Sequence, residues 1–312
     1  MDDLTLRSYR STDAGAVSRL FREIYGDHYV QPHVYLPLMI NQNHGDGSWH
    51  SLVAQSGKKI LGHATLCRNP GSSTAELALS VVHPSTRGQN IATQLGSRLL
   101  IHAQALGCHG VTIKQVTQHP YTQRMADRLG FCSSGLLLDY CPSPFGEPLP
   151  ESIVIGYTPI DGYRRPLPAL PWPQSCAKFM EHLCGVYGTQ DKEPPWVGPQ
   201  IHVEPCTGRY DVMLKKLDSS LLKQLQRLPA HWLLSIRLRL ANGFACAVES
   251  LTAMGFTFTG IAPNDRCAGW LALFHRGYRP RSLELHCPHM QRLHDQAQSQ
   301  IAAHAKEASP PS

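Results

Sequence analysis

The sequence predicts an α/β protein made of two domains. Strand and helix patterns alternate through residues 1–157, a proline-rich interval covers 158–200, and a second run of such patterns fills 201–290. A chain of 312 residues that is 42% hydrophobic has the length and apolar content for two cores. We therefore expect a mixed, mostly antiparallel twisted sheet flanked by helices, followed by a second, smaller α/β domain.

The first domain begins with an alternating strand pattern over residues 4–10. Asp13 is predicted to cap the helix that follows, residues 14–26. Residues 26–47 are irregular, and two strands, WHSLVAQSG and KKILGHATLC, then form a hairpin. His63 in the second of these strands is expected in the core.

A more buried strand, TAELALSVV, comes next, and its last part is apolar on both faces. From Gln89, apolar residues recur at helical spacing until Gly107 ends that helix. The strand GVTIKQV, the helix HPYTQRMADRL and two further strands, FCSSGLLLDY and ESIVIGY, complete about 157 residues.

The remaining boundaries follow from composition. Residues 158–200 are predicted to be a proline-rich linker with a short helix near Ser175–Tyr187, because proline at this density disrupts longer elements. The second domain covers 201–290, and residues 291–312 are predicted to be a polar C-terminal tail, disordered after Ala302.

An internal repeat relates the two domains. VTIKQV leads through a helix to GFCSSG in the first, and LLSIRLRL leads through a helix to GFTFTG in the second. Each copy carries Gly-Phe, three residues, then Gly, followed by a further strand. The repeat predicts a duplicated domain.

Charge and composition limit the classes of partner. The net charge of +6 includes the scattered pairs Lys58-Lys59, Arg164-Arg165 and Lys215-Lys216, which a solvated surface explains as well as an anionic partner does. No nucleic-acid-binding module is recognisable, and no apolar run approaches the roughly 18 residues of a membrane span. The N-terminus has no signal-peptide core, and the ten cysteines form no CxxC pair, so we expect reduced thiols and a cytoplasmic location.

The stretch HPSTRGQNIA (83–92) joins the apolar strand to the long helix. Pro84 ends the strand, and the first helix amides after Gly88 have no partner within the helix. These donors and the helix dipole suit phosphate oxygens, and Arg87 adds a guanidinium that binds a pyrophosphate with two hydrogen bonds. Small residues at 88 and 92 allow close approach, so the loop predicts a phosphate-bearing ligand.

At these residues the sequence resembles the GNAT superfamily of N-acetyltransferases. LALSVVHPSTRGQNIATQLGSRLL matches the pattern V-x-P-x-x-R-G-x-G-I-A/G, and VTQHPYTQRMADRLGF matches the helix that leads to Gly-Phe. The order of elements in residues 4–157 also agrees. The second copy lacks a counterpart of HPSTRGQNIA, so we expect a degenerate GNAT-like domain after the first.

The resemblance implies transfer of an acyl group from acetyl-CoA, or another acyl-CoA, to a primary amine, with no metal. A backbone amide near Val82 would polarise the thioester carbonyl. The implied CoA contacts are listed in chain order as Val82, Arg87, Gly88, Gln89, Asn90, Ile91, Ala92 and His119. Glu76 is the carboxylate on that strand and the candidate base; a solvated glutamate at a strand end is the alternative.

The chain departs from the family pattern at three positions. Asn90 replaces a glycine, but asparagine tolerates left-handed backbone geometry, so binding should survive. Ala126 stands where a tyrosine often protonates the leaving thiolate, and Tyr121 lies on another helix face. His119 replaces an asparagine and can still donate one hydrogen bond. Because of Ala126, a non-catalytic acyl-CoA sensor or interaction module is the alternative function.

The acceptor is a small-molecule amine or a protein lysine or N-terminus. The loop IYGDHYVQPHVYLP (24–37) lies where the family binds acceptors, and its candidates are Tyr25, His28, Tyr29 and Tyr35, with His33 beside them. These side chains either line a pocket or pack the loop. The cluster HCPHMQRLH (286–294) fits no zinc spacing, and we interpret it as surface residues.

Overall fold

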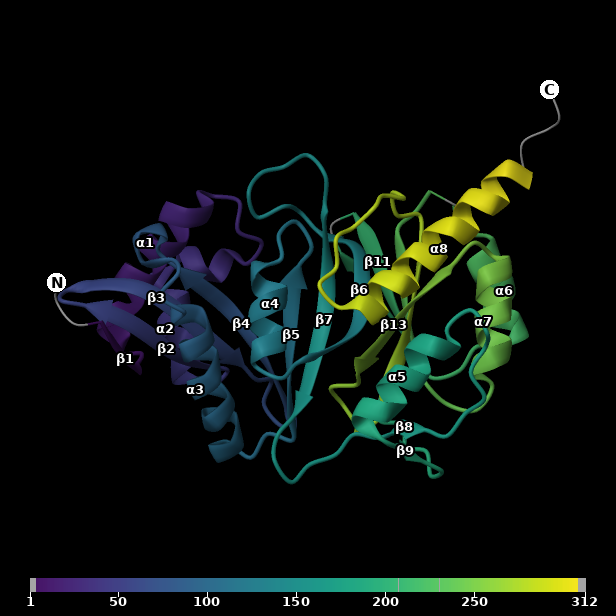
Figure 1. Cartoon of the computed structure of the whole chain (residues 1–312), viewed down its shortest axis with the longest axis horizontal. Helices are drawn as coiled ribbons and strands as arrows, with labels where there is room; N and C mark the ends of the chain where they lie inside the picture. The colour runs from purple at the N-terminus through teal and green to yellow at the C-terminus, as the bar shows by residue number, and fades with distance from the viewer. Residues whose placement is uncertain (1–3, 207, 230, 308–312) are drawn as a thin grey trace.

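A continuous sheet joins both halves of the chain in the computed structural model, which describes residues 4–206, 208–229 and 231–307 (Figure 1). Twelve strands lie in the order β1-β2-β3-β4-β5-β7-β6-β13-β14-β12-β11-β10, and β8 and β9 form a separate two-stranded sheet. Most neighbours are antiparallel; β4 with β5 and β11 with β12 are parallel. The predicted mixed, mostly antiparallel α/β fold is confirmed.

The first half contains, in order, β1 (Thr5–Ser8), η1 (Ser11–Asp13), α1 (Ala14–Tyr25), η2 (Pro32–Tyr35), α2 (Pro37–Gly45), β2 (Trp49–Ser56), β3 (Lys59–Cys67), β4 (Thr74–Val82), η3 (Pro84–Thr86), α3 (Ile91–Ala105), β5 (Gly110–Val116), α4 (Tyr121–Arg128), β6 (Cys132–Cys141) and β7 (Glu151–Pro159). Helices α3 and α1 cover opposite faces of β2–β4. Ala54 packs with the α3 core and its neighbour Val53 with the α1 core, as strand alternation requires.

The rest of the chain contains β8 (Leu167–Pro168), α5 (Ala177–Tyr187), β9 (Thr189–Gln190), β10 (Ile201–Cys206), β11 (Arg209–Leu214), α6 (Ser219–Gln226), β12 (Leu234–Arg239), α7 (Phe244–Ala253), β13 (Thr257–Pro263), β14 (Trp270–Arg276) and α8 (Pro288–Glu307). The strand order β10-β11-β12-β14-β13 repeats the order β3-β4-β5-β7-β6, with the same parallel and antiparallel relations. The two halves of the sheet therefore share one strand order, and the duplication stays a prediction.

The repeated glycines have the same structural roles in both halves. Gly130 and Gly255 follow α4 and α7 with φ of 81° and 78°, which ends each helix in the left-handed region. Gly135 and Gly260 face each other where β6 meets β13, and this contact joins the two halves of the sheet. A Cβ at Gly260 would lie 2.5 Å from the Ser134 carbonyl oxygen, so the strands meet only because both residues lack side chains.

We expect Gly260→Ala to lower the free energy of unfolding by about 2–4 kcal/mol, because its φ is +106° and its Cβ would overlap backbone. Gly107→Ala is the matched control, since Gly107 also has a positive φ of 69° but meets nothing within 4 Å. Gly107→Ala should lower the free energy of unfolding by about 1 kcal/mol. Urea unfolding of both variants tests this; equal losses would show that the contact between β6 and β13 contributes nothing.

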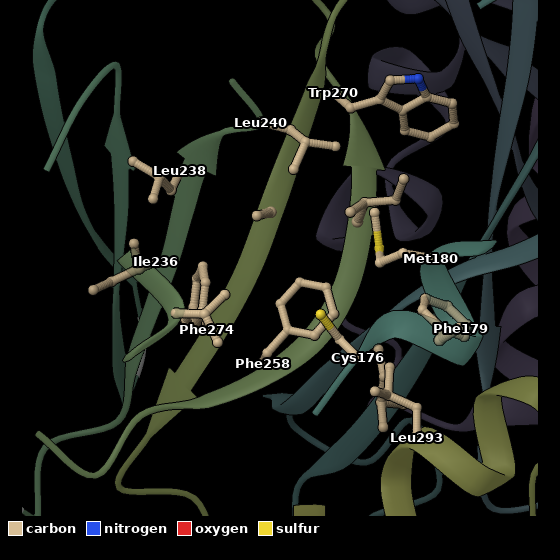
Figure 2. Packing of buried hydrophobic residues seen from close by; sticks show 14 of the residues in the cluster. Cys176, Phe179, Met180, Ile236, Leu238, Leu240, Phe258, Trp270, Phe274 and Leu293 are labelled. Atoms are coloured by element: carbon tan, nitrogen blue, oxygen red, sulfur yellow. The ribbon is translucent and has the colours of Figure 1, made fainter. Parts of the chain in front are cut away.

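The predicted linker and tail both pack on the core of the second half. Phe179, Met180 and Leu183 of α5 are buried beside Trp270 and Phe258, as Figure 2 shows for the labelled residues. Helix α8 crosses the sheet where β6 and β13 meet (Figure 1). Its buried side chains, listed in order, are Met290, Leu293, His294 and Ala297.

Four local expectations differ from the structure. In the stretch 286–294, interpreted as surface residues, Met290, Leu293 and His294 are buried because one face of α8 packs on the sheet. Residues from 291 continue α8 instead of forming an irregular tail, because an apolar face packs on the sheet; residues 308–312 lie outside the described part. Residues 37–45, expected to be irregular, form α2 with Pro37 in its first turn. Asp13 precedes α1 without a side-chain capping bond; its carboxylate binds the Arg7 guanidinium at 2.7 and 2.9 Å.

Candidate functional site

Strands β4 and β5 separate towards the end that carries the predicted loop. Their registered pairs run from Thr74–Gly110 to Leu77–Ile113, whereas β4 continues to Val82 and β5 to Val116. A bulge in β4 accompanies the separation: Leu79 has φ of +52°, and the pairing with β3 shifts register there. The two strands therefore open a wedge beside the end of β4.

The loop from His83 to Asn90 lies at the mouth of this wedge. Pro84–Thr86 form a single 3₁₀ turn, held by a 3.1 Å bond from the Thr86 hydroxyl to the His83 carbonyl. Gly88 has φ of +84° and Asn90 of +59°, so Asn90 adopts the left-handed geometry expected of it. The exposed residues of this loop, in order, are Pro84, Ser85, Arg87, Gly88, Gln89 and Asn90.

The first turn of α3 presents backbone donors to the same space. Its first hydrogen bond runs from the Gln94 amide to the Asn90 carbonyl at 3.0 Å, so the amides of residues 91–93 precede the helical ladder. Ile91 directs its side chain into the core, at 2% exposure, and contributes only its amide to this surface. Ala92 and Val82 are half-buried.

His119 lies after β5, across the wedge from the loop. Its Nδ1 is buried, and no hydrogen-bond partner for it exists among the described residues. A buried ring nitrogen without a partner costs free energy, and a ligand in the wedge would satisfy it. Its ring lies 5.2 Å from Tyr121 and 6.4 Å from Phe145.

Glu151 positions the segment before His119, and sequence reasoning missed it. Its buried Oε1 accepts hydrogen bonds from the Thr117 amide at 2.6 Å, the Thr117 hydroxyl at 2.9 Å and the Gln118 amide at 3.0 Å. A glutamate at the start of a strand carries no signal of this role, because its partners are 34 and 33 residues earlier in the chain.

Glu76, the candidate base, forms an ion pair with Lys114 of β5 at 2.9 Å. The Glu76 carboxylate raises the pKa of Lys114. The side chain of Glu76 is 27% exposed. The second half contains the same arrangement. In the register of β4 with β5, Glu76 is opposite Thr112, two residues before Lys114. In the register of β11 with β12, Asp211 is opposite Ser235, two residues before Arg237. Arg237 Nη2 lies 3.3 Å from Asp211 Oδ2. The matching register makes Asp211–Arg237 the counterpart of Glu76–Lys114.

The predicted acceptor loop forms an aromatic cluster above β4. The rings of Tyr25 and Tyr29 are 4.8 Å apart, and Phe145 from the β6–β7 loop lies 5.3 Å from Tyr25. Burial raises the pKa of Tyr29, and the charges of Tyr25 and Glu76 raise it further. Burial also raises the pKa of Tyr25, which the nearby Arg87 lowers.

The other members of that loop have separate surroundings. The Tyr35 hydroxyl accepts a 2.9 Å bond from the Tyr29 amide, so Tyr35 braces the loop. His28 is exposed beside Gly146, and His33 is exposed. Ala126 is buried at 1%, and Tyr121 is 71% exposed on the surface of α4. His63 is buried, as expected.

Residues 15–131, which contain the loop and the wedge, match the model of the acetyltransferase (GNAT) family. The matched residues include β4, the loop, α3 and His119. No curated protein matches the chain.

The solved structures that are similar to this chain include several N-acetyltransferases. One from Staphylococcus aureus Mu50 is 17% identical, covering 51% of this chain and 99% of its own, with a TM-score of 0.45. Spermidine N-acetyltransferase from Vibrio cholerae, in complex with CoA and spermine, is 20% identical over 51% of this chain and 97% of its own, with a TM-score of 0.44. Ribosomal-protein-S18-alanine N-acetyltransferase from Escherichia coli is 16% identical, covering 55% of this chain and 100% of its own, with a TM-score of 0.43.

Two further properties concern the described residues only. None of their helices is long and apolar enough to cross a membrane. Within the same residues, no group of three or more His, Cys, Asp or Glu side chains is arranged to hold a metal ion.

Proposed function

We propose that this protein is an N-acyltransferase that moves an acetyl or other acyl group from acyl-CoA to a primary amine. The observation that carries the proposal is the exposed Arg87 beside the free amides of α3, at the point where β4 and β5 separate. Arg87 and the amides of residues 88 and 90–92 would bind the pyrophosphate, whereas the Gln89 amide already donates to the Thr86 carbonyl at 3.4 Å. His119 would donate to the pantetheine arm through its unpartnered Nδ1.

Bound acyl-CoA would supply an activated thioester, and the chain supplies the groups around it. The amide near Val82 would donate to the developing oxyanion. Glu76 would accept the proton of the amine in its ionised form, which Lys114 stabilises. Val82 lies six residues after Glu76, about 20 Å of extended strand, so water would carry the proton between them. Tyr25, Tyr29, Tyr35 and His28 would border the acceptor.

We expect Arg87→Ala to weaken CoA binding by about 10- to 100-fold, because it removes a charge-assisted contact with the pyrophosphate. Calorimetric titration of CoA measures the change. Lys58→Ala, which removes an exposed charge from the β2–β3 turn, is the control and should bind like the parent. Unchanged CoA affinity in Arg87→Ala would refute the assignment of this loop.

A non-catalytic acyl-CoA sensor is the second candidate, and two observations favour it. Ala126 supplies no proton donor for a leaving thiolate, and the ion pair of Glu76 has a counterpart in the half that lacks the cofactor loop. Acetyl-CoA consumption with a panel of small amines and lysine peptides separates the candidates. CoA binding without turnover of any acceptor would favour the sensor.

We also propose that the second half is a degenerate GNAT-like domain. The equivalent strand order and the shared glycine positions support this proposal. Between β11 and α6 there is no counterpart of HPSTRGQNIA, so this half would brace the first and border its acceptor side rather than bind CoA.

A further inference from the structure

A second pocket lies at the outer edge of the first half, away from the CoA loop. It has a volume of about 660 Å³, within the range of small-molecule sites. Its walls come from the end of β1, from α2, from the first half of β2 and from the exposed side of α3. Strand β1 pairs with β2 only as far as Ser8–Leu52, so the pocket opens where β1 ends.

The side chains that line this pocket favour an anion. Arg98 is its permanent cation, three histidines border it, and its lining contains no aspartate or glutamate. The histidines are His44, His50 and His102, of which the last two have ring centroids 5.4 Å apart. Trp49, Leu52 and Ile101 add apolar surface that suits a flat organic group.

A buried chain of hydrogen bonds leads from His44 through the sheet to the β4 bulge. In order, it joins the Ile40 carbonyl, His44 Nδ1 and Nε2, Ser51 Oγ, Thr65 Oγ1, His63 Nε2 and Nδ1, and the Leu79 carbonyl. The successive distances are 2.7, 2.8, 2.7, 3.3 and 3.0 Å. The chain thus connects the pocket with the bulge beside the proposed CoA site.

This chain is one proton short when both histidines are neutral. Five contacts need five hydrogens, whereas two neutral imidazoles and two hydroxyls supply four. The carbonyls at the two ends only accept, so each terminal ring nitrogen must carry a hydrogen. One added proton, on either His44 or His63, would satisfy every contact.

The surroundings oppose that added proton in the free protein. The pKa of His63 is lowered to about 4, chiefly by burial. Nearby His44 also lowers this pKa, and Asp13 raises it. Burial also lowers the pKa of His44; His50 lowers it, and the Ile40 carbonyl and Asp46 raise it. Arg98 and His102 on α3 border the same pocket, and the Tyr9 ring, whose pKa burial raises to about 12, stacks on the His44 imidazole at 3.8 Å. At neutral pH both histidines are therefore neutral, and an anion near His44 would favour the charged form.

We propose that this pocket binds a small carboxylate with a flat apolar body, and that binding draws one proton into the chain at His44. Arg98 and His102 would hold the carboxylate, and Trp49 would contact the flat body. The negative charge would stabilise the imidazolium of His44, so that all five contacts are satisfied. Because His44 is neutral at pH 7 before binding, the proton comes from solvent.

The test uses benzoate as the probe and benzamide as its neutral counterpart, on the full chain. Titration calorimetry in Tris and in HEPES, whose ionisation enthalpies differ, measures the protons taken up. We expect saturable benzoate binding, about tenfold or more tighter than benzamide, with uptake approaching one proton at pH 7. Uptake should decrease as the pH is lowered, because His44 is then charged before binding, and affinity should weaken as the pH rises.

Variants locate the site and the proton. Arg98→Gln should weaken benzoate binding about tenfold, whereas Arg128→Gln on α4 should not. His44→Gln should abolish proton uptake. Arg87→Ala should keep benzoate affinity, which separates this pocket from the CoA loop whatever the fate of the acyltransferase proposal. Three results would each overturn the proposal. They are equal affinity for benzamide and benzoate, benzoate binding that Arg98→Gln does not weaken, and benzoate binding without proton uptake.

Discussion

Replacing Arg165 with methionine is expected to lower the free energy of unfolding by about 3–5 kcal/mol. Arg165 is 4% exposed, and its Nη1 donates to the Asn264, Cys267 and Gly269 carbonyls at 3.1, 3.3 and 3.0 Å. Its Nη2 donates to the Thr74 hydroxyl at 3.1 Å. Methionine would fill much of the volume but remove all four bonds, although the Gly269 carbonyl would keep its bond from the Asn264 amide at 2.9 Å.

The neighbouring arginine provides the control. Arg164 is exposed, so Arg164→Met should change the free energy of unfolding by no more than about 0.5 kcal/mol. Arg165→Lys should fall between the two, because an ammonium keeps the charge without the planar fork. Denaturant unfolding of the three variants measures the effect. If Arg165→Met were as stable as Arg164→Met, the bonds from the linker to the β13–β14 loop and β4 would not stabilise the fold.

This arginine pair shows where sequence reasoning reaches its limit. Arg164 and Arg165 are chemically identical, and both suited a solvated surface. Their different environments arise from carbonyls about 100 residues later in the chain, which no local pattern encodes. The same holds for α8, whose polar sequence hides a narrow apolar stripe that becomes visible only once β6 and β13 lie beneath it.

Features governed by local chemistry could be predicted. The left-handed Asn90 and the helix end at Gly107 each depend on backbone preferences of single residues, and the structure confirms them. The register of β4 with β5, the bulge at Leu79 and the role of Glu151 depend on contacts between distant strands. For the candidate site, sequence therefore indicated the loop but not the wedge behind it.

Substituting Glu76 with glutamine is expected to lower kcat for acetyl transfer by about 10²- to 10⁴-fold, with little change in the KM for acetyl-CoA. The amide has the size of the carboxylate but takes up no proton. Glu76 lies on β4 below the aromatic cluster, where Tyr29 is close enough to be influenced by its charge. Steady-state kinetics with an accepted amine provide the measurement.

The internal repeat supplies a control that separates chemistry from ion pairing. Asp211→Asn disrupts the equivalent pair with Arg237 in the half without a CoA loop, and it should leave kcat unchanged. Glu76→Gln should lose about 0.5–1 kcal/mol of stability, since its ion pair is partly exposed. Asp211→Asn should lose more, because Asp211 is 12% exposed and also pairs with Arg209 at 2.8 Å, so the two variants are compared by kcat and not by stability. Lys114→Met removes the ion pair but keeps the carboxylate, so it should retain most of the activity. If Glu76→Gln lowered kcat no more than Asp211→Asn does, Glu76 would hold Lys114 in place rather than accept the proton of the amine.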